Sequence, residues 1–180
     1  KKIDIAQEQS LNRMGLTTDL SRPRIVVITS SAGVTGSGAF IEMGYLANFL
    51  AQQEGIQVDV ELMLFMPTAY AVVNQNGTQA NAYAALMELE AAMRGNNAFV
   101  GRWNNSDCPV LGSMPYSEVY LLDNSNLAKQ HLRNIENVYQ MLATNLFEDF
   151  SSGDFALRKC SIAVNQAQYK TTLYEAPFQD

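Results

Sequence analysis

The chain has few of the residues that build metal centres and disulfide frameworks. Among 180 residues there are two cysteines, Cys108 and Cys160, and one histidine, His131. A zinc site of cysteine and histidine would lack ligands, so the sequence predicts no metal held by protein side chains. Two thiols in a chain of this length are typical of reduced cytosolic proteins, and we expect a cytoplasmic location.

Basic residues and long apolar runs are also scarce. The 12 Lys and Arg are outnumbered by 18 Asp and Glu, which gives a formal net charge of −6. An acidic surface argues against nucleic-acid binding, which needs clustered basic side chains. No apolar run approaches the roughly 20 residues of a membrane-spanning helix. The 47% hydrophobic content is nevertheless enough to bury the core of one domain.

Strand-like and helix-like segments alternate along the chain. Arg24–Thr29 carries four consecutive β-branched apolar residues, which is typical of a parallel strand buried on both faces. The alternation predicts an α/β fold with an open, mostly parallel sheet. We expect strands at 24–29, 58–66, 118–122, 160–164 and 169–174, helices at 39–53, 81–93 and 127–150, a loop or irregular helix at 70–79, and a surface excursion with a short strand or hairpin at 96–117.

A glycine-rich segment, Ala32–Gly38, joins the first of these strands to its helix. In open α/β sheets ligands bind at the carboxyl ends of strands, and a glycine-rich turn lets main-chain N–H groups approach an anion there. Phosphate is therefore the expected ligand, although a tight packing turn without a ligand is the alternative. The P-loop pattern is excluded because no lysine occurs between Lys2 and Lys129, and the order of the glycines differs from the dinucleotide fingerprint.

The segment AGVTGSG resembles the tubulin signature loop, a small residue followed by Gly-Gly-Thr-Gly-Ser-Gly, with Val34 as the one departure. The longer run IVVITSSAGVTGSGAFIEMGYLANFLA looks like the bacterial tubulin-like proteins, a family distinct from eukaryotic tubulin and the cell-division homologue FtsZ. This resemblance covers about residues 24–150. It implies a Rossmann-like, tubulin-type nucleotide-binding half-domain over residues 1–150, with 151–180 beginning a following segment or second domain.

The resemblance also implies roles for individual residues toward GTP or GDP, with Mg²⁺ as a possible companion. The loop would hold the phosphates, Pro67 would border the ribose, and Asn124 or Asn126 would reach the base or sugar. Either Glu136 or Asn137 would read the guanine edge. Asp154, with Glu148 and Asp149 as rivals, would orient water for hydrolysis at a neighbouring subunit. The implied phosphate contacts are Ala32, Gly33, Val34, Thr35, Gly36, Ser37 and Gly38.

Three functions remain open from the sequence. The first is guanine-nucleotide binding by a self-associating, filament-forming protein, a GTPase only if the full-length protein assembles. The second is a non-enzymatic scaffold of the same fold with a degenerate pocket, and the third is an unrelated α/β protein that binds another phosphorylated ligand. Nothing before Arg24 resembles the first phosphate loop of tubulins, so that loop either lies upstream of Lys1 in a longer protein or is absent. We expect the former, because the chain begins with Lys1 rather than Met.

Several residues also have simpler interpretations. Thr35 and Ser37 are ordinary helix-capping types, and Asn124 and Asn126 are ordinary turn residues. Trp103 is expected to anchor its own loop. Core filling is expected of the Met and Tyr residues Met43, Tyr45, Met87, Met93, Tyr139 and Met141.

Overall fold

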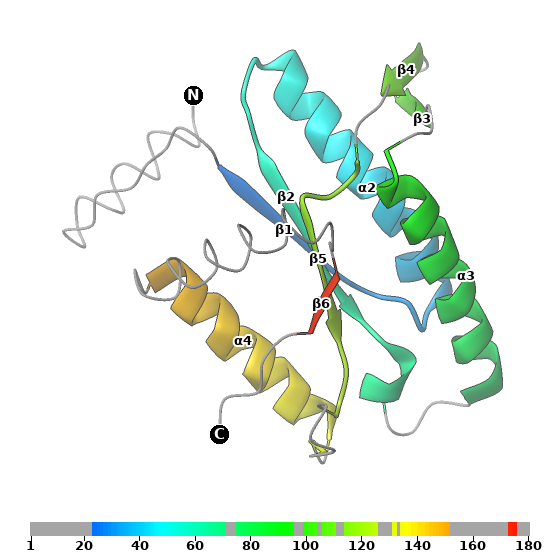
Figure 1. The fold of residues 1–180 in the computed structure, drawn as a ribbon, viewed down its shortest axis with the longest axis vertical. Coiled ribbons are helices and arrows are strands. Elements are labelled where there is room, and N and C mark those ends of the chain that lie inside the picture. Colours follow the sequence, from blue (N-terminus) through cyan, green and yellow to red (C-terminus); the bar gives the residue numbers. More distant parts are fainter. Residues whose placement is uncertain are drawn as a thin grey trace.

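The protein is an α/β structure in which strands and helices alternate (Figure 1). The computed structural model describes residues 23–70, 75–95, 99–103, 106–110, 114–125, 131–132, 134–151 and 173–175. None of the helices in these ranges is long and apolar enough to cross a membrane.

A parallel sheet forms the centre of the fold. Its strands are β1 (Arg24–Ser30), β2 (Asp59–Phe65), β5 (Glu118–Leu122) and β6 (Leu173–Glu175), hydrogen-bonded in the order β1-β2-β5-β6. Every pairing is parallel, which confirms the predicted open parallel sheet. The register aligns Ser30 with Phe65 and Phe65 with Leu122. The carboxyl ends of β1, β2 and β5 therefore lie level at one edge of the sheet.

Helices cover both faces of this sheet (Figure 1). On one face, α2 (Val34–Gln53) and α3 (Gln75–Met93) pack on alternate residues of β2 such as Leu62 and Leu64. On the other face, α4 (Ile135–Ser151) packs on Met63 and Phe65 of the same strand. Since β2 is buried on both faces, a parallel arrangement with crossover helices is the economical way to cover it.

The helix starts differ from the sequence expectations. α2 begins at Val34 rather than 39, so most of the glycine-rich segment is the first turn of a helix, with Ser37 N–H donating to the Gly33 carbonyl at 3.1 Å. α4 begins at Ile135 rather than 127, because Asn134 Oδ1 accepts the Asn137 N–H at 3.0 Å and caps the helix. α3 begins at Gln75, so the expected loop at 70–79 is partly helical.

A hairpin of β3 (Phe99–Trp103) and β4 (Ser106–Val110) lies in the predicted surface excursion. The indole of Trp103 packs against Phe49 of α2 with ring centroids 5.2 Å apart, and its Nε1–H donates to Glu42 at 3.0 Å. Phe99 stacks on Tyr45 at 4.3 Å. Trp103 is thus an anchor of its own hairpin, as expected.

Some expectations about side chains and strands were wrong or fall elsewhere. Met43, Met87 and Tyr139 are not core filling, because 47 to 49% of their surface is exposed. The strand expected at 160–164 lies outside the described residues. Of the strand expected at 169–174, only residues 173 and 174 are described, and both belong to β6.

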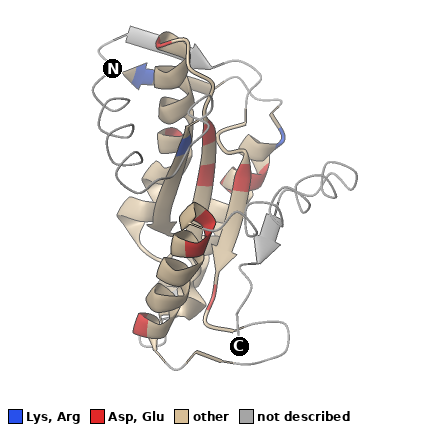
Figure 2. Cartoon of the chain, turned by 90° about the vertical axis from the view of Figure 1, so that its left-hand side faces the viewer, with Lys and Arg blue, Asp and Glu red and all other residues tan. Residues whose placement is uncertain are grey.

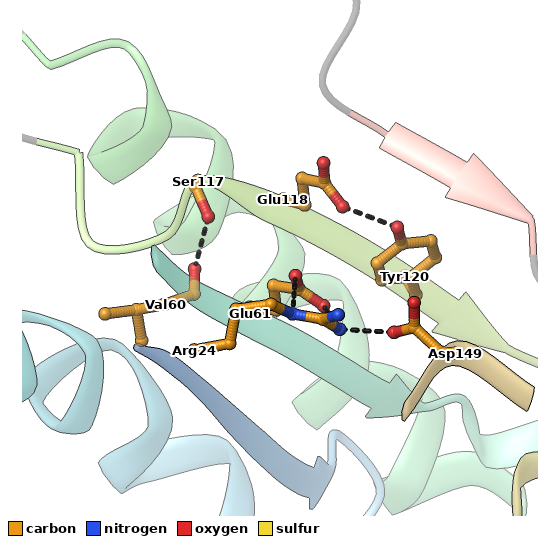
Figure 3. A network of polar contacts seen from close by, with 7 residues as sticks. All are labelled: Arg24, Val60, Glu61, Ser117, Glu118, Tyr120 and Asp149. Atoms are coloured by element: carbon orange, nitrogen blue, oxygen red, sulfur yellow. Dashed lines mark hydrogen bonds and ion pairs between the residues drawn. The ribbon is translucent and has the colours of Figure 1, made fainter. Parts of the chain in front are cut away.

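A charged cluster ties α4 to the amino ends of the strands (Figure 3). Arg24 of β1 donates to Asp149 near the end of α4, and its Nη2 also donates to Glu61 of β2 at 3.1 Å. Its Nε lies 2.9 Å from Glu61 Oε1, an ion-pair contact without hydrogen-bond angles. Burial lowers the pKa of Arg24, but the bond to Asp149 and the charges of Glu61 and Asp149 outweigh it and raise the pKa. Asp149 is therefore committed to a structural ion pair.

We predict that Asp149→Asn lowers the free energy of unfolding by about 2 kcal/mol, because it removes the charge from a mostly buried hydrogen-bonded pair. Urea denaturation at neutral pH measures the change. The control is Glu90→Gln in the exposed Arg94–Glu90 pair of α3, where less than about 0.5 kcal/mol is expected. Equal losses in the two variants would contradict a stabilising role for the Arg24 cluster.

Tyr116, which precedes β5, gives a second prediction. Its buried hydroxyl donates to the Phe40 carbonyl of α2, and burial raises its pKa. Since the raised value belongs to the folded state, this contribution to stability is complete below the unfolded pKa of about 10 and is lost as pH rises above it. Tyr116→Phe should cost about 1 kcal/mol at pH 7, and its stability should fall less steeply above pH 10.

Urea midpoints between pH 7 and 11 measure both effects. Tyr83→Phe is the control, because that ring is 69% exposed. A parent and a Tyr116→Phe variant that lose stability in parallel above pH 10 would show that Tyr116 does not ionise late in the folded protein.

Candidate functional site

Residues from three segments meet at the carboxyl edge of the sheet. The loop after β1, the short 3₁₀ helix η1 (Pro67–Ala69) after β2, and Asp123–Asn124 after β5 all follow strand ends that are level with one another. Hydrogen bonds continue past these ends, from Ser31 N–H to the Phe65 carbonyl at 3.0 Å and from Met66 N–H to the Leu122 carbonyl at 2.8 Å. The segments of the predicted phosphate loop, Pro67 and Asn124 are therefore neighbours in space.

The first turn of α2 has main-chain donors without a cap. Gly33 is the N-cap residue, with φ −100° and ψ 157°, and no side chain caps this helix. An α-helix leaves its first N–H groups without partners within the helix, which here are those of Val34, Thr35 and Gly36. No acidic residue lies in this turn, and Gly33, Val34 and Thr35 are exposed. These amides and the helix dipole form an electropositive end open to an anion.

Serine hydroxyls hold the bend rather than face outward. Ser30 Oγ accepts the Ala32 N–H at 3.1 Å, and Ser31 Oγ donates to the Phe65 carbonyl at 3.1 Å. Ser37 donates both its hydroxyl, at 2.6 Å, and its N–H to the Gly33 carbonyl. In this arrangement Ser37 contributes by fixing the turn, and the main-chain amides of Val34, Thr35 and Gly36 are left without a partner in the helix or a side-chain cap.

The three glycines of the loop meet different surroundings. A Cβ on Gly36 would lie 2.5 Å from the Ser30 carbonyl oxygen and 2.8 Å from Thr29 Oγ1, so the close approach of α2 to β1 requires glycine there. A Cβ on Gly33 or Gly38 would meet nothing within 4 Å. Val34 is 81% exposed and helical, so its branched side chain does not obstruct the turn.

The start of α4 borders the same edge. Glu136 is exposed in its first turn, and Asn137 is partly buried with its N–H bonded to Asn134. Tyr139 packs edge-on against Phe65 with centroids 5.4 Å apart. Partial burial is the largest cause that raises the pKa of Tyr139. The charge of Tyr70, a hydrogen bond with Tyr70 and the charge of Glu136 raise the pKa further. This Tyr70–Tyr139 contact was not predicted from the sequence, which indicated a core position for Tyr139 and a loop or irregular helix for Tyr70.

Side-chain charge at this edge is acidic. In the described part of the chain, Lys and Arg are few and Asp and Glu are more numerous, as the blue and red segments of Figure 2 show. The three arginines are Arg24 at the start of β1, Arg94 just after α3 and Arg102 in β3. Asp123 follows β5 and Glu136 lies in the first turn of α4, at the carboxyl edge. The described ranges contain no group of three or more His, Cys, Asp or Glu that could hold a metal ion. Two predicted site residues, Asn126 and Asp154, lie outside the described residues.

The glycine surroundings predict opposite effects for two similar substitutions. Gly36→Ala should destabilise the protein by about 2 kcal/mol, because its Cβ would collide with main-chain atoms. Gly38→Ala should stabilise it by up to about 1 kcal/mol, because alanine favours a helix and the space is open. Thermal and urea denaturation of the unliganded proteins measure both. A tolerated Gly36→Ala would contradict the close approach of α2 to β1.

Comparisons with known proteins agree with this architecture. A comparison with curated proteins and one with solved structures each found no match. The model of the family described as "Tubulin like" matches residues 1–178, nearly the whole chain. Together with the parallel sheet and the glycine-rich start of α2, this match shows that the chain belongs to the tubulin-like family.

Proposed function

We propose that the protein binds a guanine nucleotide, GTP or GDP, with its phosphates at the amino end of α2. The observation that carries the proposal is the uncapped first turn, where the N–H groups of Val34, Thr35 and Gly36 have no partner within the helix and no side-chain cap. The tubulin-like family of the chain supports a nucleotide as the ligand. Open space at Gly33 and Gly38 supports close approach of a phosphate.

For the base, we favour Glu136 over Asn137 as the residue that reads guanine. Glu136 is exposed in the first turn of α4, whereas Asn137 is partly buried. The guanine edge offers two N–H donors, and an ionised carboxylate only accepts hydrogen bonds. Pro67 and Asn124 border the same edge and are proposed to contact the sugar, with Asn126 as the alternative to Asn124.

The acidic character of this edge suggests that Mg²⁺ accompanies the nucleotide. Asp123 and Glu136 would repel a polyphosphate, and three amides offset only part of its charge. A cation carried by the phosphates reduces that repulsion without needing a set of protein ligands.

The site is proposed to be completed by polypeptide beyond the described residues. In the described part of the sheet β1 is an edge strand, yet it is strongly apolar, and Ile25 and Ile28, on opposite faces, are 38% and 49% exposed. A strand of this composition is typical of a sheet interior. We propose that a further strand pairs along β1, and that the loop following it supplies the second phosphate contact.

Self-association and hydrolysis are the finer parts of the proposal. We propose that full-length copies assemble in the cytoplasm and that Asp154 of one copy orients water at the nucleotide of the next. The commitment of Asp149 to Arg24 supports Asp154 and Glu148 over Asp149 for this role.

We predict that Thr35→Asp separates binding from stability in the full-length protein. An acid in the first turn should stabilise α2 by about 0.5 kcal/mol, whereas repulsion of the phosphates should weaken GTP binding at least about tenfold. Titration with a fluorescent GTP analogue and urea denaturation measure the two effects. Gln53→Glu is the control, because it adds the same charge to α2 at its other end.

The outcomes distinguish the proposed functions. Undiminished GTP binding by Thr35→Asp would exclude the first turn of α2 as the phosphate site. Phosphate release and sedimentation of the parent with GTP and GDP test assembly and hydrolysis. Binding without turnover or pelleting would leave the scaffold function, and preference for an adenine nucleotide would favour an unrelated phosphate-ligand protein.

A further inference from the structure

Ser31, which joins β1 to the phosphate loop, is buried and makes two hydrogen bonds to the neighbouring strand β2. Ser31 is fully buried, at 0% exposure. Its N–H and its hydroxyl both point at the Phe65 carbonyl, at 3.0 and 3.1 Å. Met66 Sδ lies 3.9 Å from the same hydroxyl, but a thioether is a weak acceptor, so the carbonyl takes the hydrogen.

These two hydrogen bonds to one carbonyl fix the direction in which the chain leaves the sheet. A chain that leaves a strand with no further contact can change direction after the last hydrogen bond between the strands. The Ser31 N–H adds one more main-chain hydrogen bond to β2, and the Ser31 hydroxyl adds a side-chain hydrogen bond to the same carbonyl. Two residues later Gly33 is the N-cap of α2, so the direction of the amides of Val34–Gly36 depends on where Ser31 is held.

Phe65 extends the link to the other side of the site. Its carbonyl accepts hydrogen bonds from the N–H and the hydroxyl of Ser31. Its ring packs edge-on against Tyr139 of α4, with centroids 5.4 Å apart, and its centroid lies 6.2 Å from that of Tyr70. The next residue, Met66, is bonded to Leu122 at 2.8 Å. One residue of β2 thus holds the phosphate loop and the start of α4 at a set separation.

We propose that Ser31 is a positioning residue of the nucleotide site, which aims the amides of Val34–Gly36 at the phosphate without touching the ligand. The sequence signature of the loop starts after Ser31, so motif comparison alone leaves it out. The expected effect of Ser31 on nucleotide binding rests on the proposed phosphate site. The expected effect of Ser31 on the direction of the amides does not.

The fold supplies a control with the same pair of donors at the opposite edge of the sheet. Ser117 donates its N–H and its hydroxyl to the Val60 carbonyl of the same strand β2, at 2.7 and 3.0 Å (Figure 3). The site is remote, and Ser117 is exposed whereas Ser31 is buried, so only the response of the α2 amides, not the loss of stability, is compared between the two variants. Ser31→Ala and Ser117→Ala therefore each delete one hydroxyl that shares a carbonyl with a main-chain donor.

The first experiment needs no ligand. In the full-length protein, Ser31→Ala should shift the ¹⁵N–¹H resonances of Val34, Thr35 and Gly36 and speed their amide exchange, and Ser117→Ala should leave them unchanged. Resonances that are the same in parent and Ser31→Ala would overturn the proposal. A similar response to both variants would show general loosening and would overturn it as well.

The second experiment measures binding. GTP affinity should fall about tenfold in Ser31→Ala, because misdirected amides would lose about the equivalent of one hydrogen bond to the phosphate, and it should stay at the parental value in Ser117→Ala. Unchanged affinity beside shifted amides would overturn the role in binding. If the parent itself binds neither GTP nor GDP, the proposed function fails, while the amide resonances still decide whether Ser31 positions the turn.

Discussion

The arrangement of this protein depends on a helix whose first amides are left uncapped at the end of a buried strand. Most helices satisfy these groups with a serine, threonine or acid at the N-cap. Here Gly33 occupies that position, and the nearby serines direct their hydroxyls at other main-chain atoms. Exposure to water makes the missing cap tolerable. The same exposure makes the amides available to an anion, so the local instability of the helix and its capacity for binding have one cause.

Positive charge has a different source at each end of the sheet. At the amino ends, Arg24 is held between two buried carboxylates, Glu61 and Asp149, and fixes the last turn of α4. At the carboxyl edge, the α2 amides supply positive potential, because the three arginines within the described ranges lie elsewhere. The electrostatic effect of a helix dipole decreases to little beyond about one turn from the helix end. It therefore favours a ligand that makes close contact and gives little long-range attraction.

The sequence predicted the strands more accurately than the helix boundaries. β1 and β5 were located within one residue because uninterrupted apolar runs mark strands that are buried on both faces. The start of α2 was missed because three glycines suggest a loop, although Gly36 is there to let a helix approach β1. The start of α4 was missed because Asn134 is one of several polar residues that could cap it. The Arg24–Asp149 pair joins residues 125 apart in sequence, a relation that no local pattern encodes.

The loop signature itself divides into a part required by the fold and a part that the fold does not require. Gly36 is required by packing whether or not a ligand binds, since any side chain would meet the Ser30 carbonyl. Gly33 and Gly38 have open space, no positive φ and no packing need, and Gly38, which lies inside the helix, costs about 1 kcal/mol relative to alanine. A scaffold that had lost its ligand would need only Gly36. The presence of all three glycines therefore favours a loop that still accommodates a bound group over one that serves packing alone.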